Sequence, residues 1–251
     1  MSNNHIWDST VPALVAAGYR TLRYDHIGHN LTPPPQDPEL NKPGVFSFDS
    51  FCHHLYRIVQ TVAPGTVPAG MIGCSIGGVL VLRYQMLYPP PAGHATKIIS
   101  CDAPGLKSLE ESKPKWRARI EQWKREGSNA KLAEQTYERW FPDPVPKNFD
   151  KENALEIIRS TTLEGYEICA WATMNFDYED GLDGMEGGEG VLVLVGGNDT
   201  NIGDRGVLRR VHERVKGSSY VLMEGVGHIP PLHWPGRFEG VVVGFLGVVE
   251  Q

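Results

Sequence analysis

The sequence lacks the features that mark several classes of protein. None of its apolar runs approaches the roughly 20 residues that a membrane-spanning helix needs. The first residues, Met1–Trp7, contain neither the basic nor the apolar segment of a secretory signal. The formal net charge is −6 and the lysines and arginines are scattered, so no basic face is available for nucleic acid or an anionic membrane. We therefore expect a cytoplasmic protein without a nucleic-acid or membrane partner.

Cysteine is scarce and shows no paired spacing. The four cysteines stand at positions 52, 74, 101 and 169. This spread argues against a disulfide framework and against a Cys-x-x-Cys metal site, and it predicts reduced, mostly buried thiols. The adjacent His53 and His54 would lie on different faces of a helix, so they cannot jointly bind one metal ion. We expect neither a metal nor an organic cofactor.

Two parts of the chain alternate between strand-like and helix-like segments, which is typical of a parallel sheet flanked by helices. The length of 251 residues suits one such core. The predicted strands cover residues 20–24, 67–73, 97–101, 191–195 and 220–223, and the predicted helices cover residues 6–17, 48–62, 77–88, 204–215 and 237–249.

The alternation stops between residues 106 and 177. Helix patterns recur there almost without strand signal, and a glycine-rich return linker follows at residues 181–190. We therefore predict an α/β core formed by residues 1–105 and 186–251, with a helical cap, residues 106–185, inserted in it. The predicted cap helices cover residues 116–125, 130–140, 152–160 and 165–174.

The segment Gly73-Cys74-Ser75-Ile76-Gly77 matches the pattern G-x-S-x-G. An apolar strand pattern precedes it and a helix pattern follows it, which is the setting of a nucleophilic serine on a strained turn. Cys74 is the rival nucleophile, because thiols are intrinsically reactive. A cysteine on the same turn would need glycine at positions 72 and 76, and both are isoleucine. The sequence therefore predicts Ser75 as nucleophile and the Ile76 amide as a donor to the oxyanion.

A nucleophilic serine needs a base and a residue that orients the base. His228 follows the last predicted strand in the flexible run Gly225-Val226-Gly227-His228 and is the candidate base. Asp199 lies in a glycine turn after residues 191–195 and is the candidate acid. The chain order serine, aspartate, histidine is the one used by hydrolases of this architecture. Asp102 stays as an alternative acid, because it also ends a predicted strand.

Five other histidines fall into two groups. His26 and His29 flank Gly28 in an early loop, and one of them could line the substrate pocket. His94, His212 and His233 are predicted at the surface.

The cap contains more large aromatic residues than its own packing requires. These residues are Trp140, Phe141, Trp171 and Phe176. We expect the cap to cover the mouth of the Ser75 site and some of these rings to face the substrate, with Trp140 and Trp171 as the predicted substrate-binding residues.

These residues together resemble an α/β-hydrolase of the 3-oxoadipate enol-lactonase type, and the resemblance runs from Trp7 to the C-terminus. The matches in the cap matter most, because caps differ between families of this fold. The motifs that carry the resemblance are Trp7-Asp8 with Val11-Pro12-Ala13-Leu14, Arg23-Tyr24-Asp25 with Gly28-His29, Gly73 to Gly78, Arg139-Trp140-Phe141, Glu164-Gly165-Tyr166 with Cys169-Ala170, Gly197-Asn198-Asp199, and Glu224-Gly225 with Gly227-His228.

The chain departs from this family in three places. Ile27-Gly28-His29-Asn30 stands where the family has Arg-Gly-His-Gly, and no Thr-Pro follows Asp199. The resemblance also implies about three strands ahead of the Trp7 helix, which this sequence does not contain. The usual oxyanion loop would then fall at or just before Met1, and Ser2 or Asn3 would have to supply its donor. We expect such a chain to be clipped, slower, and prone to associate through an unpaired sheet edge, so an oligomer is possible.

The resemblance and the candidate triad imply a serine hydrolase that cleaves a carboxylic ester or lactone through an acyl-enzyme. Two alternatives stay open at this point. The chain could be a ligand-binding protein or pseudoenzyme that keeps the pocket, or an enzyme of secondary metabolism that uses the same pocket for a non-hydrolytic reaction.

Overall fold

The structure is a computed structural model that describes residues 1–182, 185, 187–200 and 206–249. Its centre is a sheet of four strands in the order β1-β2-β3-β4. The strands are β1 (Gly70–Cys74), β2 (Lys97–Cys101), β3 (Val191–Gly196) and β4 (Ser219–Met223). Every neighbouring pair is parallel, so all strands end at the same edge of the sheet. The residues that follow the strands therefore meet at that edge.

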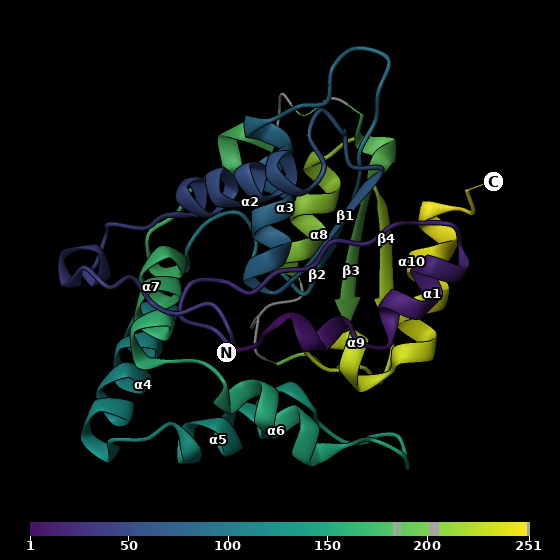
Figure 1. The fold of residues 1–251 in the computed structure, drawn as a ribbon. Coiled ribbons are helices and arrows are strands. Elements are labelled where there is room, and N and C mark those ends of the chain that lie inside the picture. The colour runs from purple at the N-terminus through teal and green to yellow at the C-terminus, as the bar shows by residue number, and fades with distance from the viewer. Residues whose placement is uncertain (183–184, 186, 201–205, 250–251) are drawn as a thin grey trace.

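Helices cover both faces of the sheet (Figure 1). The helices α2 (Phe48–Val62), α3 (Ile76–Leu87) and α8 (Gly206–Arg214) lie on one face. The helices α1 (Thr10–Ala16) and α10 (Pro235–Leu246) lie on the other. The predicted parallel sheet flanked by helices is therefore confirmed.

The strand β3 separates two apolar cores. Val191, Val193 and Val195 pack with α2, α3 and α8. Leu192 and Leu194 pack with α1 and α10. Successive residues of a strand point to opposite faces, so a strand that is buried on both faces needs an unbroken apolar run.

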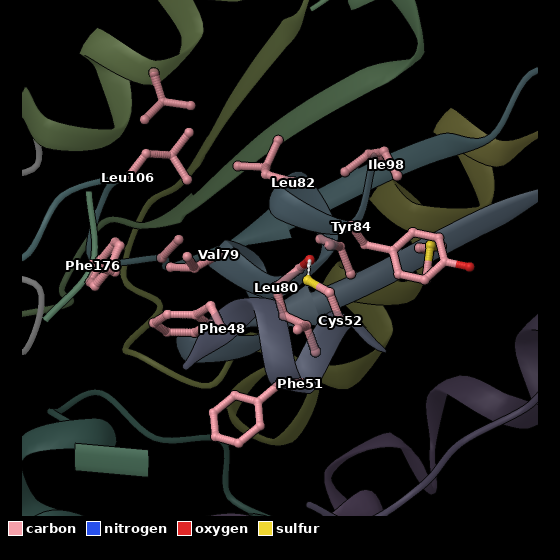
Figure 2. Packing of buried hydrophobic residues seen from close by; sticks show 14 of the residues in the cluster. Phe48, Phe51, Cys52, Val79, Leu80, Leu82, Tyr84, Ile98, Leu106 and Phe176 are labelled. Atoms are coloured by element: carbon pink, nitrogen blue, oxygen red, sulfur yellow. Dashed lines mark hydrogen bonds between the residues drawn. The ribbon is translucent and has the colours of Figure 1, made fainter. Parts of the chain in front are cut away.

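The core on the first face is built mainly from α2 and α3 (Figure 2). Phe48 and Phe51 of α2 lie near Val79 and Leu80 of α3, and all four side chains are at most 3% exposed. The Cys52 thiol donates to the Leu80 carbonyl at 3.6 Å. Burial of one such large apolar side chain stabilises the fold by roughly 1.5–3 kcal/mol, so this core fixes α3 firmly on the sheet.

The segment from residue 106 to residue 177 contains four α-helices and no strand. They are α4 (Lys113–Glu126), α5 (Ala130–Trp140), α6 (Lys151–Arg159) and α7 (Leu163–Met174). Figure 1 shows them grouped at the lower left, with α5 and α6 on the side to which the arrows of β3 and β4 point. The helical segment therefore lies at the edge where the strands end.

Short helices complete the described chain. They are η1 (Asn4–Trp7), η2 (Pro38–Asn41), η3 (Glu110–Ser112), η4 (Glu179–Leu182), η5 (Gly188–Gly190) and α9 (Pro230–His233).

Local hydrogen bonds explain where two of the longer helices begin. Ser47 and Ser50 form a capping box at the start of α2, whose bounds agree with the sequence prediction. The Thr162 hydroxyl accepts from the Gly165 amide at 3.1 Å and caps α7. Each cap satisfies an amide that has no partner inside its helix.

The predicted strand at residues 20–24 is wrong. No described strand pairs with it, and β1 pairs only with β2. Arg20 and Leu22 are exposed instead. Strand formation needs a hydrogen-bonded neighbour, so apolar alternation alone does not produce a strand here.

Three helix predictions and the linker prediction need comment. The predicted helix 6–17 is divided into η1 and α1, and the predicted helix 237–249 ends at Leu246. Residues 204–205 of the predicted helix 204–215 lie outside the described residues, as do residues 183, 184 and 186 of the predicted linker. In the part of the chain that the structure describes, no helix has the length and apolar character to cross a bilayer.

Candidate active site

Ser75 connects β1 to α3 in a strained conformation. Its backbone angles are φ 58° and ψ −120°, in a region that residues with a side chain rarely adopt. The Ser75 amide donates to the Cys101 carbonyl at 2.8 Å, which ties the turn to the end of β2. This geometry turns the Ser75 side chain away from the sheet ladder at the edge where the strands end.

Two glycines make the turn sterically possible. A Cβ atom on Gly73 would lie 1.9 Å from the Gly77 carbonyl oxygen. A Cβ on Gly78 would lie 2.8 Å from the Ser100 hydroxyl and 2.9 Å from the Ala103 Cβ. A Cβ on Gly77 would meet nothing within 4 Å. The turn therefore requires glycine at positions 73 and 78, where neighbouring atoms leave no room for a side chain. Position 77 has room for one.

His228 lies directly beside this turn. Its Nε2 is 2.9 Å from the Ser75 hydroxyl, and its side chain is fully buried. Its backbone amide donates to the Trp140 carbonyl at 2.9 Å. A Cβ on Gly227 would lie 2.2 Å from the same carbonyl oxygen, so glycine is required for the histidine loop to contact the end of α5.

Asp199 lies behind the imidazole. Its Oδ2 is 2.7 Å from His228 Nδ1, and the residue is 3% exposed. A carboxylate at Nδ1 holds the proton on that nitrogen and leaves Nε2 free to accept the proton of the Ser75 hydroxyl. The structure thus brings Ser75, His228 and Asp199 together in one chain of hydrogen bonds. The alternative acid, Asp102, accepts from the Gly196 amide at 2.7 Å.

Cys74 is unsuited to act as the nucleophile. It is buried, and its thiol donates to the His228 carbonyl at 3.5 Å. Burial raises the pKa of the Cys74 thiol well above its ordinary value, and the nearby Cys101, Asp102 and Asp199 raise it further. Cys74 therefore stays protonated at neutral pH, and a thiol is a far weaker nucleophile than a thiolate.

The first amide of α3 is the candidate oxyanion donor. Ile76 is the first residue of α3, so its N–H has no carbonyl partner within the helix. The positive end of the helix dipole also lies there. Ser2 and Asn3 were the candidates for a second donor, and the side-chain amide of Asn3 is already bonded. Its Nδ2 donates to the Ser160 hydroxyl at 2.9 Å and its Oδ1 accepts from the His5 amide at 2.8 Å.

The two predicted substrate-binding tryptophans do not share a pocket. Trp140 is buried, and its ring centre is 5.5 Å from that of His228. Trp171 lines a separate cleft of about 160 Å³ together with Phe46 and Ile168, and no triad residue is among the lining residues of this cleft. Trp140 therefore contacts the candidate site, and Trp171 does not.

The other two cap aromatics pack into the protein interior. Phe141 stacks near Phe149, with ring centres 4.9 Å apart. Phe176 packs against Phe48 at 5.0 Å. Both side chains contribute to the apolar cores.

The early loop contacts the cap through two glycines. The Thr162 amide donates to the Gly28 carbonyl at 2.8 Å. A Cβ on Gly28 would lie 2.3 Å from the Gly165 Cα. Gly28 and Gly165 belong to two separate motifs of the family resemblance, and this close approach gives a physical reason for glycine at both positions.

The prediction that His233 lies at the surface is wrong. Its side chain is fully buried, and its Nδ1 accepts from the Gly227 amide at 2.7 Å, next to the candidate base. His29 is also buried, and its Nδ1 bonds the Ile27 carbonyl at 2.9 Å. His233 thus supports the loop that carries His228. The pair Pro230-Pro231 could have signalled the short helix α9 that buries it, because proline favours the first turn of a helix.

We expect the stability of the protein to depend on the neutral state of His233. Burial lowers the pKa of His233 to about 4. The unfolded chain therefore takes up a proton near its ordinary pKa of about 6.5 that the folded chain refuses, and this stability is lost as the pH falls from about 6.5 towards 4. His233→Asn keeps an acceptor for the Gly227 amide and removes the titration. The free energy of unfolding of wild type minus that of the variant should fall by about 2 kcal/mol between pH 7 and pH 5.

Urea unfolding of both proteins at pH 7, 6 and 5 measures this difference. Other titrating groups affect both proteins alike and cancel in it. An equal gap at pH 7 and pH 5 would show that His233 is not held neutral by burial.

Comparison with known proteins agrees with the geometry. Residues 2–233 match the α/β hydrolase fold family. The chain belongs to this family. A search of curated protein sequences found no match.

Solved structures of α/β hydrolases show the same fold at low sequence identity. A hydrolase from Pseudomonas aeruginosa is 20% identical with a TM-score of 0.80, and the match covers 98% of this chain and 86% of that one. A thermophilic esterase from Thermogutta terrifontis is 21% identical with a TM-score of 0.80, covering 98% and 85%. An enol-lactonase from Burkholderia xenovorans is 21% identical with a TM-score of 0.78, covering 98% and 87%. At this identity the likeness establishes the fold.

Proposed function

We propose that this α/β hydrolase is a serine hydrolase that cleaves a carboxylic ester or a lactone. The observation that carries the proposal is the hydrogen-bonded chain from Ser75 through His228 to Asp199, at 2.9 Å and 2.7 Å, on a strained strand-to-helix turn. Strain of this kind persists at functional sites because the surrounding structure holds it in place. A serine that had only a packing role would not require it.

The geometry supports a two-step reaction. The Ser75 hydroxyl attacks the acyl carbon while His228 Nε2 takes its proton, and Asp199 stabilises the resulting imidazolium. The Ile76 amide donates to the oxyanion of the tetrahedral intermediate. His228 then protonates the leaving alkoxide, and the acyl group stays on Ser75. A water molecule that gives its proton to His228 then attacks the acyl-enzyme, and His228 returns that proton to the Ser75 oxygen as the acid is released.

The proposed substrate class rests on chemistry and on likeness. Esters and lactones have alkoxide leaving groups that one imidazolium can protonate, so the triad needs no further acid. The esterase from Thermogutta terrifontis and the enol-lactonase from Burkholderia xenovorans share the fold, which supports an ester or lactone as substrate. Trp140 lies against His228 and supplies an apolar wall close to the reacting atoms.

Reaction with a fluorophosphonate probe tests the proposal. We expect the folded protein to be labelled on Ser75, as located by peptide mass spectrometry, and the heat-unfolded protein to be unlabelled. The labelled sample should also lose turnover of short-chain aryl esters and simple lactones in proportion to labelling. A folded sample that is neither labelled nor active on these substrates would overturn the proposal.

A further inference from the structure

A second buried carboxyl, that of Asp102, lies in the site besides that of Asp199. Asp102 follows β2 directly, is fully buried, and has a positive φ of 44°. Its amide donates to the Leu194 carbonyl at 3.0 Å, so the residue continues the contact between β2 and β3 beyond the strand end. The reaction proposed above uses three side chains and gives that of Asp102 no role. A buried carboxyl beside a buried carboxylate is costly unless the two share a proton.

The two oxygens of Asp102 have different surroundings. Oδ1 accepts from the Gly196 amide at 2.7 Å. Oδ2 is buried, and no N–H or O–H donor of the described residues bonds it. The Asp199 carboxyl lies close by, because Gly196 bonds both residues: its amide donates to Asp102 Oδ1, and its carbonyl accepts from the Asp199 amide at 3.1 Å. Two carboxyl oxygens attract each other only when a proton lies between them, so one of the two residues must be protonated.

The surroundings decide which residue holds the proton. Asp199 receives the Nδ1 hydrogen bond of His228, which favours its ionised form. Asp102 receives one amide on Oδ1, and its Oδ2 is buried without a donor from the described residues. Burial raises the pKa of the Asp102 carboxyl well above its ordinary value, and the charge of Asp199 raises it further. The proton therefore belongs on Asp102 Oδ2.

We propose that Asp102 is a positioning residue, a neutral carboxylic acid whose Oδ2–H bonds the Asp199 carboxylate and holds it on His228. This proposal rests on the proposed serine hydrolase function and deepens it. The hydrogen bond fixes the orientation of the Asp199 carboxylate and leaves a single negative charge, on Asp199, beside the imidazole. The bond of Oδ1 to Gly196 fixes Asp102 itself, because Gly196 is the last residue of β3 and its carbonyl accepts from the Asp199 amide at 3.1 Å.

Substitution by asparagine and by alanine separates this role from a packing role. In Asp102→Asn the amide oxygen can accept from Gly196 and the NH2 group can donate to Asp199, so both bonds of the neutral acid survive. In Asp102→Ala both are lost. We expect Asp102→Ala to lower kcat by about 10- to 100-fold with little change in KM, and Asp102→Asn to recover most of this loss.

The pH profile supplies a readout that packing does not move. The acid limb of kcat/KM in Asp102→Asn should stay within about 0.3 pH unit of wild type, because no charge has been removed. If Asp102 is ionised in the native protein, its replacement removes a buried anion and shifts the acid limb to lower pH by about one unit or more. Such a shift would overturn the proposal.

Ser100→Ala is the matched control, because Ser100 is buried on the same strand and its hydroxyl donates to the Gly78 carbonyl at 3.0 Å. This variant should keep kcat within about threefold of wild type, since it removes one neutral hydrogen bond away from Asp199. If Asp102→Ala behaves like Ser100→Ala, Asp102 has a packing role only and the proposal fails.

A measurement without turnover keeps this test separate from the test of function. A protonated buried carboxyl gives an infrared carbonyl band at neutral pH, and we expect one band to be present in wild type and absent in Asp102→Asn. Absence of that band in wild type contradicts a neutral Asp102 even in an active enzyme. Its presence in a protein that the fluorophosphonate does not label would support the neutral acid while the hydrolase function fails.

Discussion

Ser75→Ala is expected to abolish fluorophosphonate labelling and to lower ester turnover by at least about a thousandfold. The substitution removes the oxygen that lies 2.9 Å from His228 Nε2. Alanine fits the turn as well as serine does, because the strain there comes from the backbone and the Cβ atom is common to both residues. The variant should therefore fold, and its lost turnover should report the chemistry alone. Residual hydrolysis would come from the oxyanion donor and from substrate binding.

Cys74→Ala is the matched control for this variant. It removes the adjacent nucleophilic atom, which is buried and bonds a backbone carbonyl instead of facing His228 Nε2. We expect Cys74→Ala to keep its labelling on Ser75. Turnover in Ser75→Ala equal to that of wild type would refute Ser75 as the nucleophile. A loss of labelling in Cys74→Ala would instead indicate that the Cys74 thiol is the nucleophile.

Local sequence signals predicted the parts of the fold that form through local contacts. The helix at residues 48–62 and the strand at residues 97–101 have the predicted bounds. The strand-glycine-serine-glycine-helix pattern likewise predicted the turn at Ser75, because its strain and its glycines are all contained in one short segment. Where the physical cause lies within about ten residues, sequence patterns were sufficient.

Features that depend on distant segments were missed. The alternating residues 20–24 form no strand because no described strand lies beside them to pair with. The burial of His233 was also missed, because it depends on Phe141 and Phe149, whose ring centres lie 5.7 and 5.9 Å from that of the imidazole. Polar side chains are satisfied or left unsatisfied by partners elsewhere in the chain, so their burial depends on the tertiary structure.

The same reasoning applies to the two aspartates. Both follow strands, and the sequence favoured Asp199 because its turn contains glycines. The sequence could treat them only as alternatives. Both are buried in the structure. Asp199 bonds the imidazole of His228, and Asp102 bonds the Gly196 amide. Their relation follows from parallel strands that end side by side, since β2 and β3 are neighbours in the sheet.

Asp199→Asn is expected to lower kcat by about ten thousandfold. The asparagine NH2 group would donate to His228 Nδ1, so the imidazole proton would move to Nε2. That nitrogen would then face the Ser75 hydroxyl as a donor and could not accept its proton. Binding should change little, because Asp199 is buried behind the ring and contacts no space open to substrate. Steady-state kinetics with an aryl ester and the rate of fluorophosphonate labelling should therefore fall together while KM stays close to that of wild type.

Two controls make this result specific. Asp177→Asn alters an exposed ion pair with Lys107 and should leave kcat within about twofold, as loss of a surface pair does. Asp102→Asn applies the same chemical change to the neighbouring carboxyl and should cost far less than Asp199→Asn, because a neutral acid and an amide form the same bonds. If the two variants exchanged their effects, Asp102 would be the residue that orients the imidazole, and the 2.7 Å contact between Asp199 and His228 would not be the one used in turnover.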